Sequence, residues 1–230
     1  MSLLIPAYNE ESTIESVVGR SLATLAECTD DFELIILDDA SRDRTPSLLA
    51  ELQARNPRIT ILRHETNRGI AATFEELYRA ATKDFLFLVS GDGQYPPEAL
   101  KDCMPLLGDC DIVICNRTYK HYTPYRHLIS KCYRLLPRLL FGVELYDSGS
   151  IKCVRRSIIR EIPVESRSVF VEAERLIRAH KRSYKIGKVD IVQAPRAGGK
   201  ARGAELSTVW HSTWDMLRLW WKLQILRAQP

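Results

Sequence analysis

The sequence predicts one α/β domain with a mixed, mostly parallel sheet of the Rossmann-like type, flanked by helices. Short apolar runs alternate with helix-like stretches through the first 115 residues, which is typical of parallel βαβ units with right-handed crossovers. The runs are apolar throughout, as expected for strands that helices cover on both faces. A chain of 230 residues is also long enough for one sizeable core.

Five strands and four helices are expected in the first half of the chain. The strands are expected at residues 2–6, 32–37, 59–63, 85–89 and 111–115, and the helices at 12–27, 46–55, 70–82 and 97–107. Polar clusters directly follow four of the strands: Tyr8-Asn9-Glu10, Asp38-Asp39, Ser90-Gly91-Asp92 and Asn116-Arg117. Because ligands bind beyond the carboxyl ends of the strands in an open parallel sheet, these clusters predict a crevice for a nucleotide and a metal.

The second half of the chain is less regular. A basic amphipathic helix is expected at 124–140, interrupted at Pro137. Strands at 150–154 and 184–192, a helix at 169–180 and a basic loop at 195–203 precede a last helix from Leu206 to about Arg227. We therefore expect one domain at 1–205, followed by a tryptophan-rich amphipathic helix at 206–230.

The net charge of +4 conceals an asymmetry between the two halves. Residues 1–111 carry 20 acidic and 10 basic side chains, whereas the remaining 119 residues carry 9 and 23. An acidic half suits a cation, and a basic half suits phosphate groups or an anionic membrane surface. Two solvated faces are the alternative interpretation, and no nucleic-acid partner is expected.

The cysteines and the apolar runs indicate the compartment. Six cysteines form no CxxC pair and have no histidine at zinc spacing, so we expect reduced thiols in a cytoplasmic protein. No apolar run approaches the ~20 residues of a membrane span, which predicts a soluble or peripheral protein. The sequence starts directly on a strand and ends on a helix, which leaves open a longer chain with a membrane segment.

Two common phosphate-binding loops are missing. No GxGxxG follows the first strand, which argues against a dinucleotide oxidoreductase, and no GxxxxGK[ST] occurs, which excludes a P-loop NTPase. A protein that holds a diphosphate without such loops needs a cation, basic side chains, or both.

Three segments carry a family resemblance. They are Ile5-Pro6-Ala7-Tyr8-Asn9-Glu10, then Leu37-Asp38-Asp39-Ala40-Ser41-Arg42-Asp43-Arg44-Thr45, and Ser90-Gly91-Asp92-Gly93-Gln94-Tyr95-Pro96-Pro97. Together and in this order they resemble the family 2 glycosyltransferases, and look most like the branch of dolichyl and polyprenyl phosphate sugar synthases. The resemblance covers nearly the whole chain and implies a GT-A fold and a metal-dependent, inverting sugar transfer from a nucleotide diphosphate donor.

The resemblance also implies roles for individual residues. Pro6, Ala7, Tyr8 and Glu10 would line the base and ribose pocket; Asp39, with Asp38 beside it, would accept a hydrogen bond from the base. Asp92 occupies the second aspartate of the family's DxD motif, and Gln94 matches a further metal ligand of the polyprenyl phosphate branch. The implied metal is Mg²⁺ or Mn²⁺, because hard oxygen ligands and phosphate favour these ions.

One position departs from the family pattern. Ser90 stands where the first aspartate of DxD is expected, and a neutral hydroxyl cannot supply that charge. Weaker metal affinity is one consequence, and a catalytically degenerate nucleotide-binding protein is an alternative to be tested.

The acceptor side offers arginines. A lipid phosphate is already anionic and needs cationic positioning, whereas a sugar hydroxyl needs a general base. The segments around Arg117 and Arg126 resemble the acceptor-phosphate segments of the polyprenyl phosphate sugar synthases, although a basic surface helix without a ligand is the alternative for 124–140. Asp147 is either a base for a hydroxyl acceptor or a strand-edge turn, and Glu172 and Glu174 are expected on a solvated helix face or as partners of Arg175 and Arg178.

Two features remain near the carboxyl end. Arg196, Lys200 and Arg202 lie in a glycine-containing loop that resembles the family's lid over the diphosphate, with a basic connector as the alternative. The last helix places Leu206, Trp210, Trp214, Leu217 and Trp221 on one stripe, with Trp220 adjoining. This stripe predicts either membrane docking or a core or oligomer contact.

The leading hypothesis is transfer of a sugar from a UDP or GDP donor to a polyprenyl (dolichyl or undecaprenyl) phosphate, by a protein peripheral on the cytoplasmic membrane face. The alternative acceptor is a sugar hydroxyl of a polysaccharide or glycolipid. The sequence does not choose uracil from guanine, because either base can meet Asp39.

Overall fold

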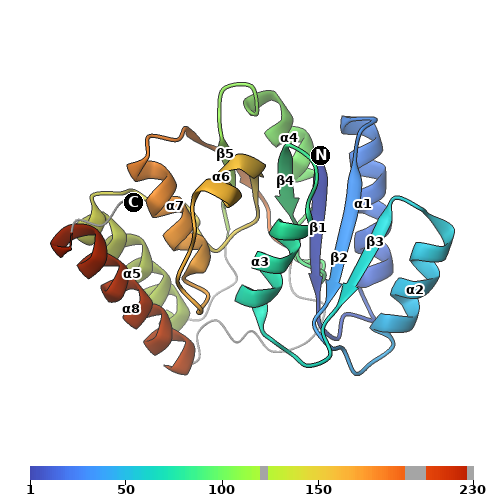
Figure 1. The fold of residues 1–230 in the computed structure, drawn as a ribbon, viewed down its shortest axis with the longest axis horizontal. Helices are drawn as coiled ribbons and strands as arrows, with labels where there is room; N and C mark the ends of the chain where they lie inside the picture. Colours follow the sequence, from blue (N-terminus) through green and yellow to red (C-terminus); the bar gives the residue numbers. More distant parts are fainter. Residues whose placement is uncertain (120–123, 195–205, 227–230) are drawn as a thin grey trace.

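In the computed structural model, a seven-stranded sheet forms the centre of the molecule, with strand order β3-β2-β1-β4-β6-β5-β7 (Figure 1). The structure describes residues 1–119, 124–194 and 206–226; within these ranges the side chains at 124, 126–128, 134 and 206 are left out. Strand β6 is antiparallel to β4 and β5, and the other pairs are parallel. This topology confirms the predicted mixed, mostly parallel sheet.

The strands are short, and most are covered on both faces. Their bounds are β1 (Ser2–Ala7), β2 (Glu33–Asp38), β3 (Ile59–Arg63), β4 (Phe85–Leu88), β5 (Ile112–Arg117), β6 (Lys152–Arg155) and β7 (Ile186–Ile191). The helices are α1 (Ile14–Cys28), α2 (Thr45–Arg55), α3 (Ile70–Ala80), α4 (Ala99–Cys103), α5 (Pro124–Phe141), α6 (Arg156–Glu161), α7 (Val171–Lys181) and α8 (Leu206–Trp220). A 3₁₀ turn, Met104–Leu106, continues α4, and a π-helical turn, Trp221–Ile225, continues α8.

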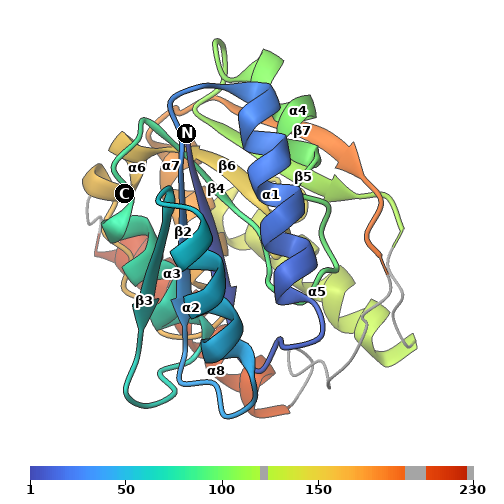
Figure 2. The same ribbon diagram turned by 90° about the vertical axis from the view of Figure 1, so that its right-hand side faces the viewer.

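Alternate strand residues serve the two faces of the sheet, as a period of two requires. Leu3 and Ile5 of β1 join the core beneath α1, α2 and α4, whereas Leu4 between them joins the core beneath α3. A third core cluster holds α5, α6, α7 and α8 together against β5 and β6. Figure 2 shows α1 and α2 on one side of the sheet and α3 on the other.

Strand order fixes where a ligand can bind. The chain builds outward from β1 through β2 to β3, then returns to place β4 on the other side of β1. The carboxyl ends of β1, β2 and β4 therefore meet at the lower edge of the sheet in Figure 1. Such a reversal of strand order opens a crevice for ligands in α/β sheets.

The second half of the chain differs from expectation in two details. A short helix, α6, follows β6 directly and has no counterpart among the predicted elements. Helix α5 continues through Pro137, so the predicted interruption is wrong. Pro137 is itself buried, and burial of Phe141 with partial burial of Leu136 and Leu140 offsets the hydrogen bond that a proline removes.

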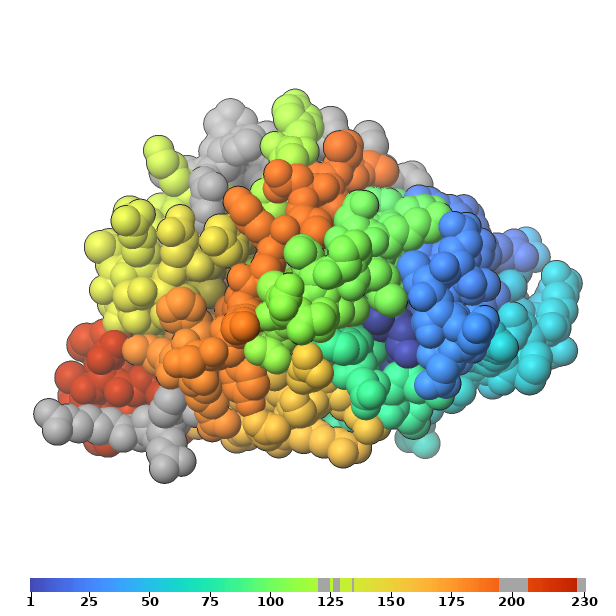
Figure 3. Space-filling view, turned by 90° about the horizontal axis from the view of Figure 1, so that it is seen from above, coloured from blue at the N-terminus to red at the C-terminus, as the bar shows by residue number. Residues whose placement is uncertain are grey.

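Helices α5 and α8 lie side by side at the end of the molecule away from β3. The Tyr133 hydroxyl of α5 donates a hydrogen bond to the Val209 carbonyl of α8 at 2.8 Å. Seen from above, β7 (orange) lies beside α4 (green), with α1 (blue) on the far side of α4 and α8 (red) at the opposite end (Figure 3).

Candidate active site

The ends of β1, β2 and β4 are joined by backbone hydrogen bonds. The Gly91 amide donates to the Pro6 carbonyl at 3.2 Å, and the Asp39 amide donates to the Ala7 carbonyl at 2.9 Å. Glycine suits the position between Ser90 and Asp92, because a Cβ at position 91 would lie 3.0 Å from the Pro6 oxygen, closer than an ordinary contact. The predicted donor segments therefore form one continuous surface.

Two turns at this surface have left-handed backbone. Asn9, after β1, has φ 56°, and Ala40, after β2, has φ 62°. The left-handed region is uncommon for residues other than glycine, and strain of this kind clusters at functional sites. Hydrogen bonds join the two turns. The Asn9 backbone amide donates to the Ser41 hydroxyl at 2.9 Å, and the Asn9 side-chain oxygen accepts from the Arg42 backbone amide at 2.8 Å. Tyr8, predicted to line the base pocket, lies at the start of this linked pair and is half-buried.

The paired aspartates after β2 are both buried, and both make contacts inside the protein. Asp38 accepts from the Ser41 amide at 2.9 Å, and its second oxygen lies 3.3 Å from Arg63 Nε. Asp39 accepts from the amides of Arg68 and Gly69 at 2.8 and 2.9 Å, and lies 2.6 Å from His64 Nδ1. Asp39 therefore fixes the loop that leads into α3, and its predicted contact with a base stays a prediction.

The loop after β4 carries the predicted metal ligands. Asp92 is 8% exposed, and one of its carboxylate oxygens accepts from the Gln94 amide at 3.0 Å. Among the described residues no group of three or more His, Cys, Asp or Glu side chains could hold a metal by itself. Asp92 and Gln94 offer hard oxygen atoms on one turn, which suits Mg²⁺ or Mn²⁺ if donor phosphate oxygens complete the coordination.

The acceptor residues predicted from the second half meet in a buried ion pair. Arg117, at the end of β5, donates from Nε and Nη2 to the two carboxylate oxygens of Asp147, at 2.5 and 2.7 Å. The two side chains are 8% and 6% exposed. Gln193 Oε1 lies 3.4 Å from Arg117 Nη1, and the Arg117 guanidinium is 5.8 Å from the centre of the Tyr95 ring. Tyr95 belongs to the Asp92 loop, so donor and acceptor candidates adjoin.

A second contact joins the two halves of the site. The Ala194 amide, at the end of the segment after β7, donates to the Gln94 carbonyl at 2.9 Å. Ala194 is the last described residue before the predicted basic loop. Arg196, Lys200 and Arg202 of that loop, and the Arg126 side chain, lie outside the described residues, so their predicted roles stay predictions.

Beside the site, the structure corrects the environment of two glutamates. Glu172 and Glu174 of α7 are 5% and 1% exposed, so the expected solvated face is wrong and the expected ion pairing is confirmed. Glu174 accepts from Arg178 Nε at 2.8 Å, and Glu172 accepts from Lys152 Nζ at 2.7 Å. Burial raises the pKa of Glu172, but the charges of Lys152 and Arg175 outweigh burial and hold it below its ordinary value. Lys152 Nζ also reaches the Ser148 carbonyl at 3.3 Å, next to Asp147.

His64 is a site residue that the sequence reasoning missed. It lies directly after β3, where the rule of polar residues at strand ends applies as it does to the other strands. Its side chain is 3% exposed and lies between the Asp39 and Glu76 carboxylates.

The tryptophan stripe of α8 faces solvent. Trp210, Trp214, Leu217 and Trp221 are 69%, 63%, 46% and 53% exposed, while Met216 and Leu219 are buried. Among the described residues, a core contact is therefore excluded for these four side chains, and Trp220 packs partly against the core. No helix in the described part of the chain has the length and apolar character needed to cross a bilayer.

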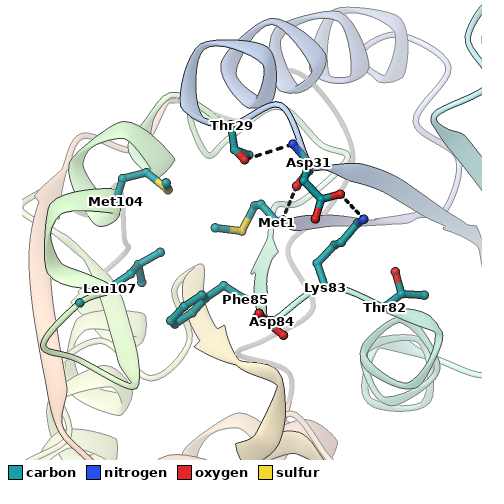
Figure 4. Close-up of a pocket in the computed structure, with 10 residues that line it drawn as sticks. Met1, Thr29, Asp31, Thr82, Lys83, Asp84, Phe85, Met104 and Leu107 are labelled. Atoms are coloured by element: carbon teal, nitrogen blue, oxygen red, sulfur yellow. Dashed lines mark hydrogen bonds and ion pairs between the residues drawn. The ribbon is translucent and has the colours of Figure 1, made fainter.

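A separate hollow lies away from these residues. A space of about 610 Å³ opens at the amino ends of β1 and β4, among Met1, Asp31, Lys83, Phe85 and Met104 (Figure 4). An ion pair between Lys83 and Asp31 crosses its wall. None of the predicted site residues lines this hollow, so the candidate site is the opposite edge of the sheet.

Comparisons with known proteins agree with this geometry. The glycosyl transferase family 2 model matches residues 2–163. A curated relative, the undecaprenyl-phosphate 4-deoxy-4-formamido-L-arabinose transferase of Pectobacterium carotovorum, is 27% identical over 91% of this chain and 64% of its own length. Glycosyltransferase AglD of Haloferax volcanii is 25% identical over 98% of this chain and 38% of its own length. The chain thus spans less than two thirds of these relatives.

Solved structures agree on the fold. Glucosyl-3-phosphoglycerate synthase from Mycobacterium tuberculosis, crystallised with Mn²⁺, uridine diphosphate and phosphoglyceric acid, superposes with a TM-score of 0.73 at 20% identity, covering 95% of this chain and 78% of that one. The same enzyme has also been crystallised with Mg²⁺ and uridine diphosphate. The GT-A fold expected from the sequence is confirmed, and because the family model covers most of the sequence, the chain belongs to glycosyl transferase family 2.

Proposed function

We propose that this chain transfers a sugar, with inversion, from a UDP- or GDP-sugar to a polyprenyl phosphate. The observation that carries the proposal is the buried arginine fork of Arg117, which Asp147 orients beside the Asp92 loop. An arginine fork suits phosphate recognition, and the adjacent loop suits a nucleotide diphosphate. The name of the Pectobacterium relative, an undecaprenyl-phosphate sugar transferase, supports the same acceptor class.

On the donor side, the crevice between β1 and β4 would hold the nucleotide. Pro6, Ala7, Tyr8 and Glu10 would line the base and ribose, and Asp39 would accept a base N–H. Asp92 and Gln94 would hold Mg²⁺ or Mn²⁺, which, when bound, neutralises charge on the departing diphosphate. The complexes of the mycobacterial enzyme with Mn²⁺ or Mg²⁺ support this choice of ion.

On the acceptor side, a lipid phosphate is ionised at neutral pH and attacks without a general base. Asp147 holds Nε and Nη2 of Arg117, and Nη1 lies toward Gln193. We assign Asp147 the task of orienting Arg117 for the acceptor phosphate. The alternative, Asp147 as base for a sugar hydroxyl, is less favoured, because a carboxylate bound by both arms of an arginine is a poor proton acceptor.

The exposed stripe of α8 supports work at a membrane surface. Tryptophan side chains on one exposed face suit the headgroup region of a bilayer, whereas Arg218 and Lys222 of the same helical segment pair with Glu165. We propose that residues 206–230 form a docking segment that places the domain of residues 1–205 peripherally on the cytoplasmic membrane face.

Steady-state kinetics with separate variation of donor and acceptor tests the proposal. Arg117→Lys keeps the charge but loses the fork, so it should raise the KM for polyprenyl phosphate far more than the KM for the donor. Arg155→Lys, at the opposite edge of the sheet beside Asp111, is the matched control and should change neither. Equal effects of Arg117→Lys on both substrates would count against its acceptor role. Absence of any turnover in the unaltered protein, despite donor binding, would favour the catalytically degenerate alternative raised by Ser90.

A further inference from the structure

The carboxylate predicted to meet the base is already largely engaged. Asp39 Oδ1 lies 2.6 Å from His64 Nδ1 and accepts from the Arg68 amide at 2.8 Å. Oδ2 accepts from the Gly69 amide at 2.9 Å. A carboxylate accepts about four hydrogen bonds, two at each oxygen. The described contacts therefore fill Oδ1 and leave one acceptor position on Oδ2.

His64 fixes this arrangement. Its Nδ1 faces Asp39, and its Nε2 lies 3.0 Å from Glu76 Oε2 on α3. Only the protonated imidazole donates from both ring nitrogens, so a carboxylate on each side favours the cation and holds the ring in place. Burial lowers the pKa of His64, but its hydrogen bonds to Asp39 and Glu76 outweigh burial and raise it.

The two candidate bases place different demands on Asp39. The Watson–Crick edge of uracil presents one N–H, flanked by two carbonyl oxygens. The same edge of guanine presents a ring N–H beside an amino group, and a carboxylate receives this pair with one position on each oxygen. Because Oδ1 is filled and Asp39 is only 4% exposed, guanine would leave one donor without an acceptor at a buried carboxylate.

We propose that His64 is a specificity-determining residue that restricts Asp39 to a single base N–H and so selects a uridine over a guanosine diphosphate donor. The inference rests on the proposed function, because it takes Asp39 as the residue that meets the base. His64 would not itself contact the nucleotide; it acts as a positioning residue, through its contact with Asp39.

Calorimetric titration with uridine diphosphate and guanosine diphosphate, each with Mn²⁺, tests this proposal. The unaltered protein should bind uridine diphosphate about tenfold or more tightly, because a buried donor without an acceptor is costly. His64→Ala reopens Oδ1 and should reduce this preference severalfold. His64→Asn keeps an N–H near the position of Nδ1 and should retain the preference. Glu76→Gln is the matched control that leaves the contact between His64 and Asp39 in place, and it should also retain it.

The readout is the ratio of the two dissociation constants, which a purely structural role of His64 would not move. Equal or tighter binding of guanosine diphosphate by the unaltered protein would overturn the inference and leave the proposed function standing. An unchanged ratio in His64→Ala would overturn the role of His64. If neither nucleotide binds, the proposed function itself fails. Should His64→Ala not fold, loss of the preference in His64→Asn or its absence in the unaltered protein would still overturn the inference.

Discussion

Replacing Asp147 by asparagine would remove one charge of the Arg117–Asp147 pair while keeping the shape of the side chain. The variant keeps the volume and one hydrogen-bonding oxygen but removes the Asp147 charge from the Arg117 guanidinium, which is 8% exposed. Removing one partner of a buried ion pair costs about 3–5 kcal/mol. Since asparagine retains part of the hydrogen bonding, we expect the lower end, about 3 kcal/mol of unfolding free energy. For a domain of this size that loss corresponds to a fall in Tm of about 6–12 °C.

Urea denaturation followed by circular dichroism measures this loss. Asp190→Asn is the matched control, because Asp190 accepts a hydrogen bond from the neighbouring Asn116 but is exposed. The control should change stability by less than about 0.5 kcal/mol. An apolar double variant, Arg117→Met with Asp147→Leu, should recover much of the loss, because neither charge of this pair remains buried. A loss below about 1 kcal/mol in Asp147→Asn, or a double variant no more stable than the single one, would refute the buried pair.

Three further predictions concern the metal, the membrane and pH. Asp92→Ala should abolish the Mn²⁺-dependent part of nucleotide-sugar binding in calorimetry, and unchanged binding would refute the metal assignment. Trp210→Ala together with Trp214→Ala should weaken co-sedimentation with anionic liposomes severalfold without lowering Tm, since both side chains are exposed; unaltered sedimentation would contradict docking. His64 faces Asp39, Glu76 and the Arg68 guanidinium, and its pKa is raised in the folded protein. Its charge therefore stabilises the fold fully below pH ~6.5, the ordinary pKa of histidine, and this contribution is lost as the pH rises through the higher pKa of the folded state. The stability difference between the unaltered protein and His64→Asn should therefore shrink from pH 6 to pH 9, and a constant difference would contradict this account.

The first half of the fold could be predicted because each element has an independent local signal. Apolar runs of five or six residues, followed by polar strand ends, correctly locate β1 to β5 and the helices between them. The weaker second half depends on tertiary packing. Helix α5 continues through Pro137 because Pro137 and Phe141 are buried and Leu136 and Leu140 are partly buried, and no local rule anticipates that outcome. Strand β6 has four residues and its antiparallel direction follows from its neighbours, not from its composition.

The site could be predicted as a set of strand ends but not as a set of contacts. Arg117 and Asp147 were identified separately, whereas their pairing across 30 residues required the structure. The same applies to Glu172, whose partner Lys152 lies on β6. The end of the third strand carries His64, a titratable residue, so the rule of polar residues at strand ends also indicates this position. For the tryptophan stripe, helical periodicity predicts that the side chains share one face of the helix, whereas the exposure of that face follows only from the structure.

Product analysis tests the central claim most directly. The protein is incubated with Mn²⁺, a panel of uridine diphosphate sugars labelled in the sugar, and either polyprenyl phosphate or a sugar-hydroxyl acceptor. The account predicts label in an organic-extractable, acid-labile lipid phosphate sugar, formed only with the phosphate acceptor and lost in Asp92→Ala. Label transferred to the hydroxyl acceptor alone, or donor bound without any label leaving it, would contradict the account.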